Sequence, residues 1–415
     1  MTQNPLHKKN IILGVTGSIA AYKAADLASK LTQNGAIVNV ILTDAAAKFI
    51  SPLSFQSVTG QPAYISADLW GAEAHVLHIG LARKADALLI APATANTLAK
   101  LARGGADDLL SLTALALGSG PDAPLLMIAP AMDAGMYSHA ATQENVEILT
   151  RRGAVFIGPE EGHLASGLVA KGRMSEPIQI LEHLRYQLSR SGPLKGCHIT
   201  VTAGPTQEDI DPVRFLSNRS TGKQGYALAQ AALDAGADVT LISGPTHLTP
   251  PAGTRLIHVR TAIEMQHATL SASKTADALI MTAAVADFRP AQPAEQKIKK
   301  AKGVLSLPLM QNPDILAAVN QQRATTLMPK ILIGFAAETQ SLTSNAEDKM
   351  RRKGLNLIVA NDVSARDAGF AVDTNRVTLL YADGHQEELP LMSKLEIAAA
   401  VIERAIPLLN PQENV

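Results

Sequence analysis

Residues 11–31 read IILGVTGSIAAYKAADLASKL. The apolar, β-branched run at 11–15 is typical of a buried strand, and the glycines and hydroxyl residues at 14–18 predict a turn. From Ile19 to Leu31 the apolar residues recur with helical spacing. A strand, a turn and a helix in this order are the first unit of a parallel α/β sheet.

Further apolar runs follow at residues 37–42, 87–90, 125–128 and 155–157, separated by helix-length segments. Buried strands that alternate with helices predict a parallel, doubly wound sheet. In such sheets ligands bind where loops leave the carboxyl ends of the strands. We therefore expect the chemistry of this chain in the loops that follow these runs.

The pattern restarts after a turn-rich stretch near residue 190, where residues 198–202 predict a new strand. Residues 235–242 (AGADVTLI) echo residues 34–41 (NGAIVNVI), although general α/β patterning could also produce this similarity. The chain is predicted to be α/β, with two tandem Rossmann-like three-layer domains and mainly parallel sheets. We place the domains at residues 1–190 and 191–415.

The composition restricts the class of protein. The 415 residues include 37 basic and 37 acidic side chains, 3% aromatics and one cysteine, Cys197. Zero net charge and few aromatic rings argue against a nucleic-acid partner. A single cysteine forms no intramolecular disulfide and favours a reducing, cytoplasmic location. No run approaches the roughly 18 apolar residues of a membrane helix, and Gly14 and Gly17 interrupt the stretch that superficially resembles a signal peptide.

The first loop, GVTGSIA at residues 14–20, lies between a predicted strand and a predicted helix. Backbone N–H groups at a helix start favour a phosphate there. The glycine spacing is not G-x-G-x-x-G, which disfavours a nicotinamide dinucleotide, and a mononucleotide such as FMN suits the loop better. A tight turn that needs glycine explains this loop alone equally well.

Four loop segments together form a more specific pattern than the first loop alone. They read GSIAAYK (17–23), HIGL (78–81), APATANT (91–97) and APAMDAGMY (129–137). In this order and spacing they resemble the loops of the flavin-containing cysteine decarboxylases, over most of residues 8–180. The resemblance implies a flavodoxin-like flavoprotein domain with bound FMN, a trimer-based assembly with flavin at subunit contacts, and oxidative decarboxylation of a C-terminal cysteine.

The same resemblance assigns candidate residues. His78 matches the catalytic histidine of the family, whereas the nearby His75 does not match. The implied FMN-binding residues are Gly17, Ser18, Ile19, Thr43, Ala93, Thr94, Ser111 and Met132.

Two candidate catalytic positions depart from the family pattern. Asp133 replaces a usual asparagine, and an ionised aspartate 4 Å from a substrate carboxylate would repel it by up to about 4 kcal/mol at an effective dielectric of 20. Asp133 must therefore be protonated, paired with a cation or differently used. Ser166 stands where the family often has a cysteine that acts as the acid in the final reduction, and serine is a much poorer proton donor. Two hypotheses follow: an active decarboxylase with another acid, or a flavin domain that stalls at the oxidised enethiol or does no chemistry.

In the second half, residues 203–223 form a long loop that reads AGPTQEDIDPVRFLSNRSTGK. A loop of this length is usually functional or disordered, and its glycine, proline and asparagine residues favour function. Residues 220–222 open the next helix, where they can cradle a phosphate.

This loop closely resembles that of phosphopantothenate-cysteine ligases. The agreement spans about residues 196–385 and continues through AAVAD (283–287), KIKK (297–300), NPDI (312–315), GFAAET (334–339) and ANDV (360–363). With the first half it implies the bifunctional enzymes of coenzyme A biosynthesis, which ligate cysteine to 4'-phosphopantothenate and then decarboxylate the product. In this family CTP activates the carboxylate as an acyl-cytidylate.

Residue roles in the ligase half follow from the same resemblance. Asn218 is expected to hold the acyl-cytidylate and Arg214 to assist it. Three lysines, Lys297, Lys349 and Lys353, offer cations to phosphates. The implied nucleotide pocket is formed by Met281, Thr282, Ala283, Asp287, Pro313, Asp314, Ile315, Leu316 and Phe335.

Other expectations concern ions and partners. Mg²⁺ is expected on charge grounds to neutralise the triphosphate, with ligands that we do not assign. The implied partners are the small-molecule substrates and further copies of the chain, as decarboxylase trimers and ligase dimers. Three alternatives stay open: an active ligase with an impaired decarboxylase domain, a flavin-binding regulatory protein, and, more distantly, a nicotinamide reductase.

Overall fold

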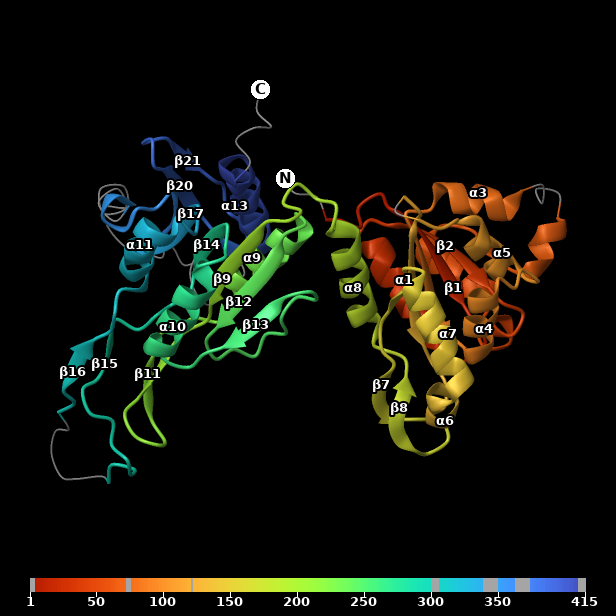
Figure 1. Cartoon of the computed structure of the whole chain (residues 1–415), viewed down its shortest axis with the longest axis horizontal. Coiled ribbons are helices and arrows are strands. Elements are labelled where there is room, and N and C mark those ends of the chain that lie inside the picture. The colour runs from red at the N-terminus through yellow and green to blue at the C-terminus, as the bar shows by residue number, and fades with distance from the viewer. Residues whose placement is uncertain are drawn as a thin grey trace. The chain divides into compact units, whose positions relative to one another are not determined.

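The computed structural model describes residues 4–71, 76–120, 122–299, 306–338, 350–362 and 374–409. The chain separates into two compact units, one ending at Leu188 and the other beginning at Ser189 (Figure 1). None of the described helices combines the length and the apolar character that a membrane span requires.

The N-terminal unit is built on a six-stranded parallel sheet in the order β3-β2-β1-β4-β5-β6. The strands are β1 (Asn10–Val15), β2 (Ile37–Leu42), β3 (Ala63–Tyr64), β4 (Ala87–Ala93), β5 (Leu125–Pro130) and β6 (Val155–Phe156). The helices are α1 (Ala21–Gln33), α2 (Pro52–Thr59), α3 (Leu77–Lys84), α4 (Ala95–Arg103), α5 (Leu109–Ala116), α6 (Ala134–Ser138), α7 (Ala140–Arg151) and α8 (Pro177–Ser189). An antiparallel hairpin, β7 (Glu160–His163) and β8 (Val169–Arg173), lies outside this sheet.

Both faces of this sheet are covered by helices, as Figure 1 shows. Successive side chains of β1 point to opposite faces, so Ile11 and Leu13 pack in one core while Ile12 packs in the other. The first core includes residues of α1 and α8, and the second includes residues of α4, α5 and α7. Because the central strands are buried on both faces, they are almost entirely apolar.

The C-terminal unit has an eight-stranded sheet in the order β13-β12-β9-β14-β17-β18-β20-β21. The strands are β9 (His198–Ala203), β12 (Asp238–Ser243), β13 (Arg255–His258), β14 (Ala278–Met281), β17 (Ile331–Glu338), β18 (Leu357–Asp362), β20 (Val377–Tyr381) and β21 (Gln386–Glu388). The pairings from β13 to β18 are parallel, and those of β20 are antiparallel. The helices are α9 (Lys223–Asp234), α10 (Ala262–Ser273), α11 (Ile315–Thr326) and α13 (Lys394–Leu409).

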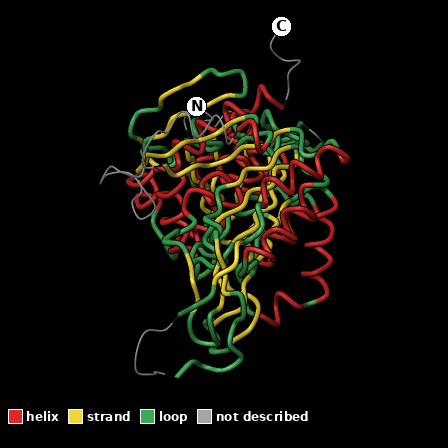
Figure 2. Tube along the Cα trace, turned by 90° about the vertical axis from the view of Figure 1, so that its left-hand side faces the viewer, coloured by secondary structure: helices red, strands yellow, loops and turns green. Residues whose placement is uncertain are grey.

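Three strand pairs lie outside this sheet: β10 (Gln207–Asp209) with β11 (Phe215–Ser217), β15 (Phe288–Pro290) with β16 (Leu309–Gln311), and β19 (Thr374–Asn375) with β22 (Met392–Ser393). Figure 1 shows the β15–β16 pair extending away from the eight-stranded sheet, and β10 contacts β15. The long loop after β9 is thus an ordered hairpin. Figure 2 shows the helices, strands and loops of the chain in a second view.

The predicted fold class is confirmed: both units are three-layer α/β structures with mainly parallel sheets. In each sheet the strand order reverses at one place, between β1 and β4 and between β9 and β14. Loops diverge at such a switch point and leave a crevice, which is where ligands bind in this architecture.

Candidate functional site

The hydroxyl of Thr16 joins the two loops at the N-terminal switch point. Its Oγ1 donates to the carbonyl of Pro92 at 2.7 Å and accepts from the N–H of Thr94 at 3.1 Å. Thr16 is 1% exposed and Pro92 is buried, whereas Thr94 is half-buried. The loop after β1 and the loop after β4 are therefore held in one geometry by a single side chain.

We predict that Thr16→Val, which keeps the shape and removes the hydroxyl, costs the N-terminal unit about 1–3 kcal/mol of unfolding free energy, because the buried carbonyl of Pro92 and the half-buried N–H of Thr94 lose their partner. Hydrogen exchange of the β1 and β4 amides measures this cost. The matched control is Thr113→Val, because the hydrogen bond described for the buried Thr113 hydroxyl goes to Leu109 of its own helix. Equal effects of the two substitutions would contradict the bridging role of Thr16.

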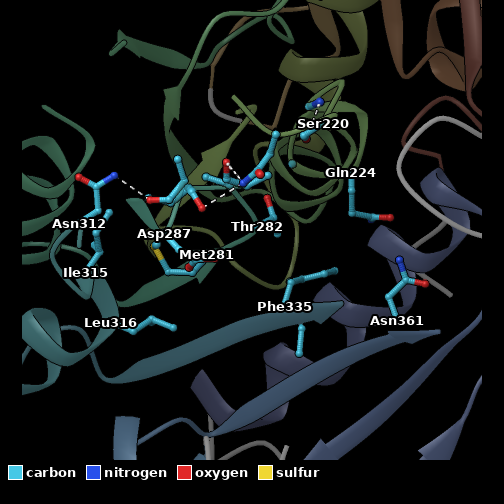
Figure 3. A pocket seen from close by; sticks show the side chains of 18 of the residues that line it. Ser220, Gln224, Met281, Thr282, Asp287, Asn312, Ile315, Leu316, Phe335 and Asn361 are labelled. Carbon is cyan, nitrogen blue, oxygen red and sulfur yellow. Dashed lines mark hydrogen bonds between the residues drawn. The ribbon is translucent and has the colours of Figure 1, made fainter. Parts of the chain in front are cut away.

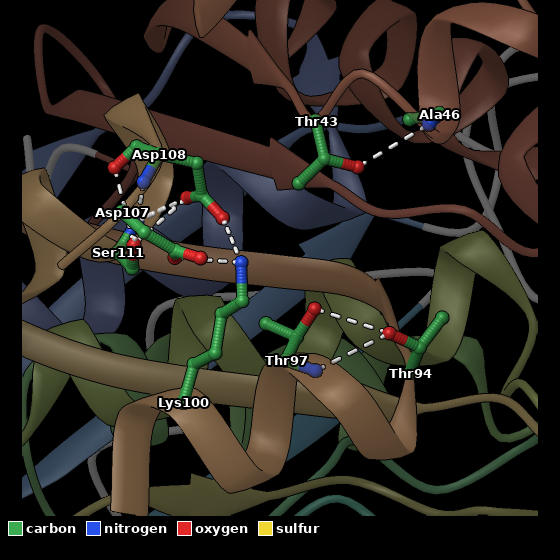
Figure 4. Close-up of polar contacts among 8 residues, drawn as sticks. All are labelled: Thr43, Ala46, Thr94, Thr97, Lys100, Asp107, Asp108 and Ser111. Carbon is green, nitrogen blue, oxygen red and sulfur yellow. Dashed lines mark hydrogen bonds and ion pairs between the residues drawn. The ribbon is translucent and has the colours of Figure 1, made fainter. Parts of the chain in front are cut away.

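Further polar groups at this edge of the sheet hold the starts of helices in place (Figure 4). Thr94 caps α4 by accepting from the N–H of Thr97, and Thr43 accepts from the N–H of Ala46 at 3.2 Å. Asp108 caps α5 by accepting from the N–H of Ser111 at 2.8 Å.

The carboxylate of Asp108 also pairs with Lys100 of α4 at 2.7 Å. Burial raises the pKa of Asp108, but the hydrogen bonds from Lys100 and Ser111 outweigh it, so the net pKa lies below its usual value. Asp108 is therefore ionised at neutral pH. The pair joins α4 to the start of α5.

Glycine is required in the first loop because the chain passes very close to its neighbours. A Cβ on Gly17 would lie 2.4 Å from the Cβ of Ala45 and 3.2 Å from its carbonyl carbon. The structure brings the predicted FMN residues to the ends of β1, β2, β4 and β5 and to the first turn of α5: Gly17, Ser18, Ile19, Thr43, Ala93, Thr94, Ser111 and Met132.

The two unusual positions of this unit, Ser166 and Asp133, are hydrogen-bond partners. Ser166 lies in the turn between β7 and β8 and donates from Oγ to Oδ2 of Asp133 at 2.6 Å. The hairpin docks at its base, where the N–H of Met132 donates to the carbonyl of Gly172 at 3.0 Å. A Cβ on Gly172 would lie 2.2 Å from the Met132 carbonyl oxygen, so this docking also requires glycine.

Asp133 caps the short helix α6 and is ionised. Its other carboxylate oxygen accepts from the N–H of Gly135 at 3.0 Å. The hydrogen bond from Ser166, and then that from Gly135, lower the pKa of Asp133 below its usual value. The described donors to the Asp133 carboxylate are thus neutral groups, and its use towards a substrate stays a prediction.

His78 lies in the first turn of α3, a half-buried helix position. Its Nδ1 is buried and has no hydrogen-bond partner among the described residues. Buried polar atoms are normally paired, so an orphan one is a candidate for contact with a ligand. His75 lies outside the described residues.

The C-terminal unit holds a cavity of about 450 Å³ at its switch point (Figure 3). Its walls come from the loop after β9, the start of α9, the end of β14, the start of α11 and strands β17 and β18. The sequence-predicted residues that line it are Asn218, Met281, Thr282, Ala283, Asp287, Pro313, Asp314, Ile315, Leu316, Phe335 and Lys353.

Threonine hydroxyls join the loops on either side of this cavity. Oγ1 of Thr202 accepts from the N–H groups of Thr282 and Ala283, each at 3.2 Å. In the loop after β9, Oγ1 of Thr206 accepts from the N–H of Ala286 at 3.0 Å. The loop after β14 is thereby fastened to the loop after β9, as the loops after β1 and β4 are in the other unit.

Asn218 spans the mouth of the same crevice. Its Nδ2 donates to the carbonyls of Ala284 and Val285, both at 3.1 Å. These two bonds fix which end of the amide is nitrogen, so Oδ1 stays available as an acceptor.

Asn312 bonds to the next residue of the same segment: its Nδ2 donates to the carbonyl of Ala286 at 2.8 Å, and its Oδ1 accepts from Arg289. Lys353 pairs with Asp314 at 3.0 Å, and Asp314 caps α11. Lys353 is therefore a lining cation whose charge is shared with a lining carboxylate.

Arg214 and Lys297 do not belong to the described lining of the cavity. Arg214 donates from Nε to Oδ2 of Asp211 at 3.0 Å and from its terminal nitrogen to the carbonyl of Ile298 at 3.0 Å. It thus ties the β10–β11 hairpin to the segment that carries the exposed Lys297. Lys349 lies outside the described residues. The substrate role of Arg214 and the phosphate roles of Lys297 and Lys349 therefore stay predictions.

Asp211 makes the stability of this hairpin sensitive to acid. The Arg214 guanidinium, together with the N–H groups of Val213, Ile298 and Arg214, holds the pKa of the Asp211 carboxyl far below its usual range. A carboxyl whose pKa is lower in the folded state contributes stability that is fully present above its unfolded pKa of about 3.9 and is lost as pH falls below it.

We therefore predict that Asp211→Asn destabilises the C-terminal unit near pH 7 and that the difference from the wild type shrinks as pH falls below about 4. Thermal unfolding across this pH range is the measurement. Asp209→Asn is the control, because Asp209 pairs with Arg260 on the exposed side of the same hairpin. A difference that stays constant with pH would contradict the prediction.

Several lining residues were missed in the sequence. Asn312 and Asn361 lie inside motifs that carry the resemblance, which was a usable signal. The sequence offered no such signal for three other lining residues, Gln224, Asn375 and Lys394. Asn375 and Lys394 come from β19 and the first residue of α13, far along the chain, and only the packing of α13 against α9 brings them to the cavity.

Comparison with known proteins covers both units. The model of the Flavoprotein family matches residues 1–189, and that of the DNA/pantothenate metabolism flavoprotein C-terminal domain matches residues 194–408. The coenzyme A biosynthesis bifunctional protein CoaBC of Bacillus subtilis is 46% identical over 97% of this chain and 98% of its own length. The protein of the same name from Vibrio cholerae is 46% identical over 95% of this chain and 97% of its own.

The chain belongs to the CoaBC family of bifunctional coenzyme A biosynthesis proteins. The family resemblance predicted from the loop motifs of both halves is thereby confirmed. Among solved structures, the C-terminal domain of a CoaBC protein is similar, with 39% identity over 54% of this chain and 100% of that chain and a TM-score of 0.45.

Two further observations concern ions and thiols. No three histidine, cysteine or acidic side chains gather into a possible metal site within the part of the chain that the structure describes. Cys197 is a half-buried free thiol just before β9. Burial, and then the charge of Asp277, raise the pKa of this thiol, so it stays protonated and is a poor nucleophile.

Proposed function

We propose that this chain ligates cysteine to 4'-phosphopantothenate with CTP in its C-terminal unit and decarboxylates the product with FMN in its N-terminal unit. The observation that carries the ligase assignment is the cavity at the β9–β14 switch point, which gathers the motif residues of the ligase resemblance. The N-terminal assignment rests on the motif loops that meet at the β1–β4 switch point and on the orphan nitrogen of His78.

The ligase must activate a carboxylate, because a carboxylate does not react with an amine. Attack of the 4'-phosphopantothenate carboxylate on the α-phosphate of CTP releases pyrophosphate and forms the acyl-cytidylate. The cysteine amine then attacks the acyl carbon and CMP leaves. The start of α9, residues 220–223, offers backbone N–H groups to phosphate oxygens.

Side chains of the cavity hold the reactants in this scheme. Asn218, fixed by two backbone carbonyls, orients the acyl-cytidylate from the crevice mouth, and Lys353 places a cation against phosphate oxygens. Phe335 supplies an apolar wall. Arg214 and Lys297 reach the substrates if the hairpins close over them, and Lys349 is a third candidate cation.

The cavity offers a magnesium ion few protein ligands, so the ion fits there only when phosphate oxygens of the nucleotide also bind it. Asp314 already pairs with Lys353, which leaves Asp287 as the described lining carboxylate for a metal. Mg²⁺ commonly binds nucleotides with one or two carboxylates and several waters. We therefore propose that Mg²⁺ enters with the triphosphate.

The residues of the N-terminal switch point fit FMN. The close approach of the chain at Gly17 exposes the start of α1 to a phosphate, and Thr94 and Ser18 offer hydroxyls beside it. Bound FMN supplies an acceptor for hydride from the carbon that bears sulfur. His78 holds or moves a proton at Nδ1, and the β7–β8 hairpin with Ser166 excludes water from the substrate.

Exposed apolar side chains support a homo-oligomer, which we propose is built from trimers of the N-terminal unit and dimers of the C-terminal unit. Ile19, Tyr22 and Trp70 are 62%, 65% and 88% exposed. Phe288 and Leu309, on β15 and β16, are also exposed. Large exposed apolar groups often mark protein contacts.

Two assays test the proposed function. Purified protein with CTP, cysteine and 4'-phosphopantothenate should release pyrophosphate continuously, whereas omission of cysteine should limit the release to about one equivalent per active site; no release with all three would overturn the ligase assignment. Purified protein with FMN and 4'-phosphopantothenoylcysteine should release carbon dioxide and yield 4'-phosphopantetheine. Ser166 favours a second candidate function, in which the N-terminal unit stalls at the oxidised enethiol. A product two hydrogens lighter than 4'-phosphopantetheine would establish this second candidate.

A further inference from the structure

Three glycines lie close together where the start of α9 lines the ligase cavity. Gly204 follows β9, Gly244 follows β12, and Gly222 is the N-cap of α9. A Cβ on Gly204 would lie 3.1 Å from the carbonyl oxygen of Gly244, and one on Gly222 would lie 3.4 Å from the Cα of Gly204. The φ angles of Gly204 and Gly222 are +76° and +79°, in the region that favours glycine. These backbone segments therefore approach each other with no side chains of their own between them.

The side chain of Thr246 packs against two of these glycines. A Cβ on Gly222 would lie 2.7 Å from Cγ2 of Thr246, and one on Gly204 would lie 3.0 Å from the same methyl group. The methyl group thus occupies the space that a side chain on either glycine would need. Gly222 lines the cavity and Thr246 does not, so an effect of Thr246 on a ligand must pass through the start of α9.

A chain of hydroxyl groups fixes the orientation of Thr246. Its Oγ1 donates to the hydroxyl of Tyr226 at 3.1 Å, and that hydroxyl lies 3.1 Å from Oγ of Ser243. Ser243 donates its one hydrogen to the carbonyl of Gly244 at 2.8 Å, so it accepts from Tyr226. Both Tyr226 and Ser243 are buried. Because Oγ1 of Thr246 is held towards Tyr226, Cγ2 is the branch that faces the other two glycines.

The position of this helix start matters because backbone N–H groups bind an anion only in the direction in which they point. Gly222 has no side chain with which to cap α9, and residues 220–223 line the cavity. Glycine is also the residue with the greatest backbone freedom, so the geometry of Gly222 depends on what packs against it. Phosphate is the anion for which a helix start is suited, and both CTP and 4'-phosphopantothenate carry it.

We propose that Thr246 is a positioning residue of the ligase, whose methyl group holds the start of α9 in the conformation that binds a substrate phosphate. This inference rests on the proposed ligase function. The hydroxyl bond to Tyr226 keeps the methyl group in place. The phosphate belongs to CTP or to 4'-phosphopantothenate, and the kinetics of the two substrates separate these sources.

The test removes only the methyl group. Thr246→Ser keeps the hydroxyl and deletes Cγ2, so the KM of a phosphate-bearing substrate should rise about 10-fold, the effect of losing one hydrogen bond to a charged oxygen. The KM of cysteine, which carries no phosphate, should stay at the wild-type value, and kcat should change little. Thr246→Val again carries a methyl group at this position and should bring the KM back close to the wild-type value. Pyrophosphate release measures all of these constants.

The matched control is Thr269→Ser. Thr269 is buried on α10 of the same unit and does not line the cavity. The substitution deletes the same methyl group from a packed position, so thermal unfolding should show a loss of stability while every KM stays at the wild-type value. A rise of the same KM in Thr269→Ser would mean that loosened packing anywhere in the unit produces the effect, and it would overturn the proposal.

The pattern of KM values decides the remaining outcomes. A rise for CTP supports the proposal and assigns the triphosphate to the start of α9, and a rise for 4'-phosphopantothenate assigns its phosphate. Unchanged values for both, or an equal rise for cysteine, refute it. Should Thr246→Ser not fold, Tyr226→Phe decides, because it removes the acceptor that orients Thr246; an unchanged KM for both phosphate-bearing substrates would again refute the proposal. Absence of pyrophosphate release by the wild type would instead refute the ligase function itself.

Discussion

Replacement of Asn218 by alanine is expected to lower kcat/KM of the ligation about 100-fold or more, the range seen when one positioned polar group of a transition-state site is removed. Asn218 fastens the loop after β11 to the carbonyls of Ala284 and Val285 and still presents Oδ1 to the cavity. Alanine removes both the positioning and the acceptor. Pyrophosphate release and formation of the cysteine adduct are measured separately, because an acyl-cytidylate that accumulates would place the loss in the second step.

The neighbouring Ser217 is the control for this variant. Its hydroxyl donates to the carbonyl of Thr206 at 2.7 Å and supports the same loop without lining the cavity. Ser217→Ala should therefore cost some stability and little activity. Equal losses in both variants would show that order in the loop, and not contact of Asn218 with the reactants, carries the effect. Decarboxylation by the N-terminal unit should be unchanged in both.

Replacement of His78 by alanine is expected to lower decarboxylation about 100- to 10,000-fold, the usual contribution of a positioned acid or base. The reason is the orphan Nδ1, which in the empty site is a buried polar atom without a described partner. The flavin should stay bound, because His78 lies on α3 and not in the loops that cradle phosphate. Carbon dioxide release and the flavin spectrum are the two measurements.

His139→Ala is the matched histidine control. The ring of His139 accepts from the N–H of Ala141 at 3.2 Å and caps α7, so its loss should weaken a helix start and leave the chemistry intact. Loss of flavin together with activity in His78→Ala would contradict a catalytic role. The ligase assay on the same protein reports whether the whole chain is folded, since His78 and the ligase cavity belong to separate compact units.

The loop motifs were readable because each is local. A strand, a glycine turn and a helix start use consecutive residues, so GVTGSIA and APATANT predicted their own geometry, and the strand that begins at His198 was placed correctly. Parallel topology then brings the ends of neighbouring strands together without further information. For this reason most of the predicted nucleotide residues line one cavity.

Contacts between segments far apart in the chain could not be read in the same way. Ser166 and Asp133 were two separate departures from a pattern, and only the docking of the β7–β8 hairpin on Met132 makes them one hydrogen-bonded pair. Arg214 was expected beside the substrate, which stays a prediction; its pair with the buried carboxylate of Asp211 was not foreseen. That pair depends on hairpin register, which a single side chain does not reveal.

The sequence by itself determined the layered α/β fold, the family and the positions of the loops that carry chemistry, because strand and helix periodicity and turn residues act over short stretches. The tertiary structure decided the electrostatic state of Asp133, the clamp at Asp211 and the chain of hydroxyl groups from Thr246 through Tyr226 to Ser243. These properties depend on burial and on which atoms lie within 3 Å or so of each other. Such distances are set when the elements pack, and the order of residues along the chain does not contain them explicitly.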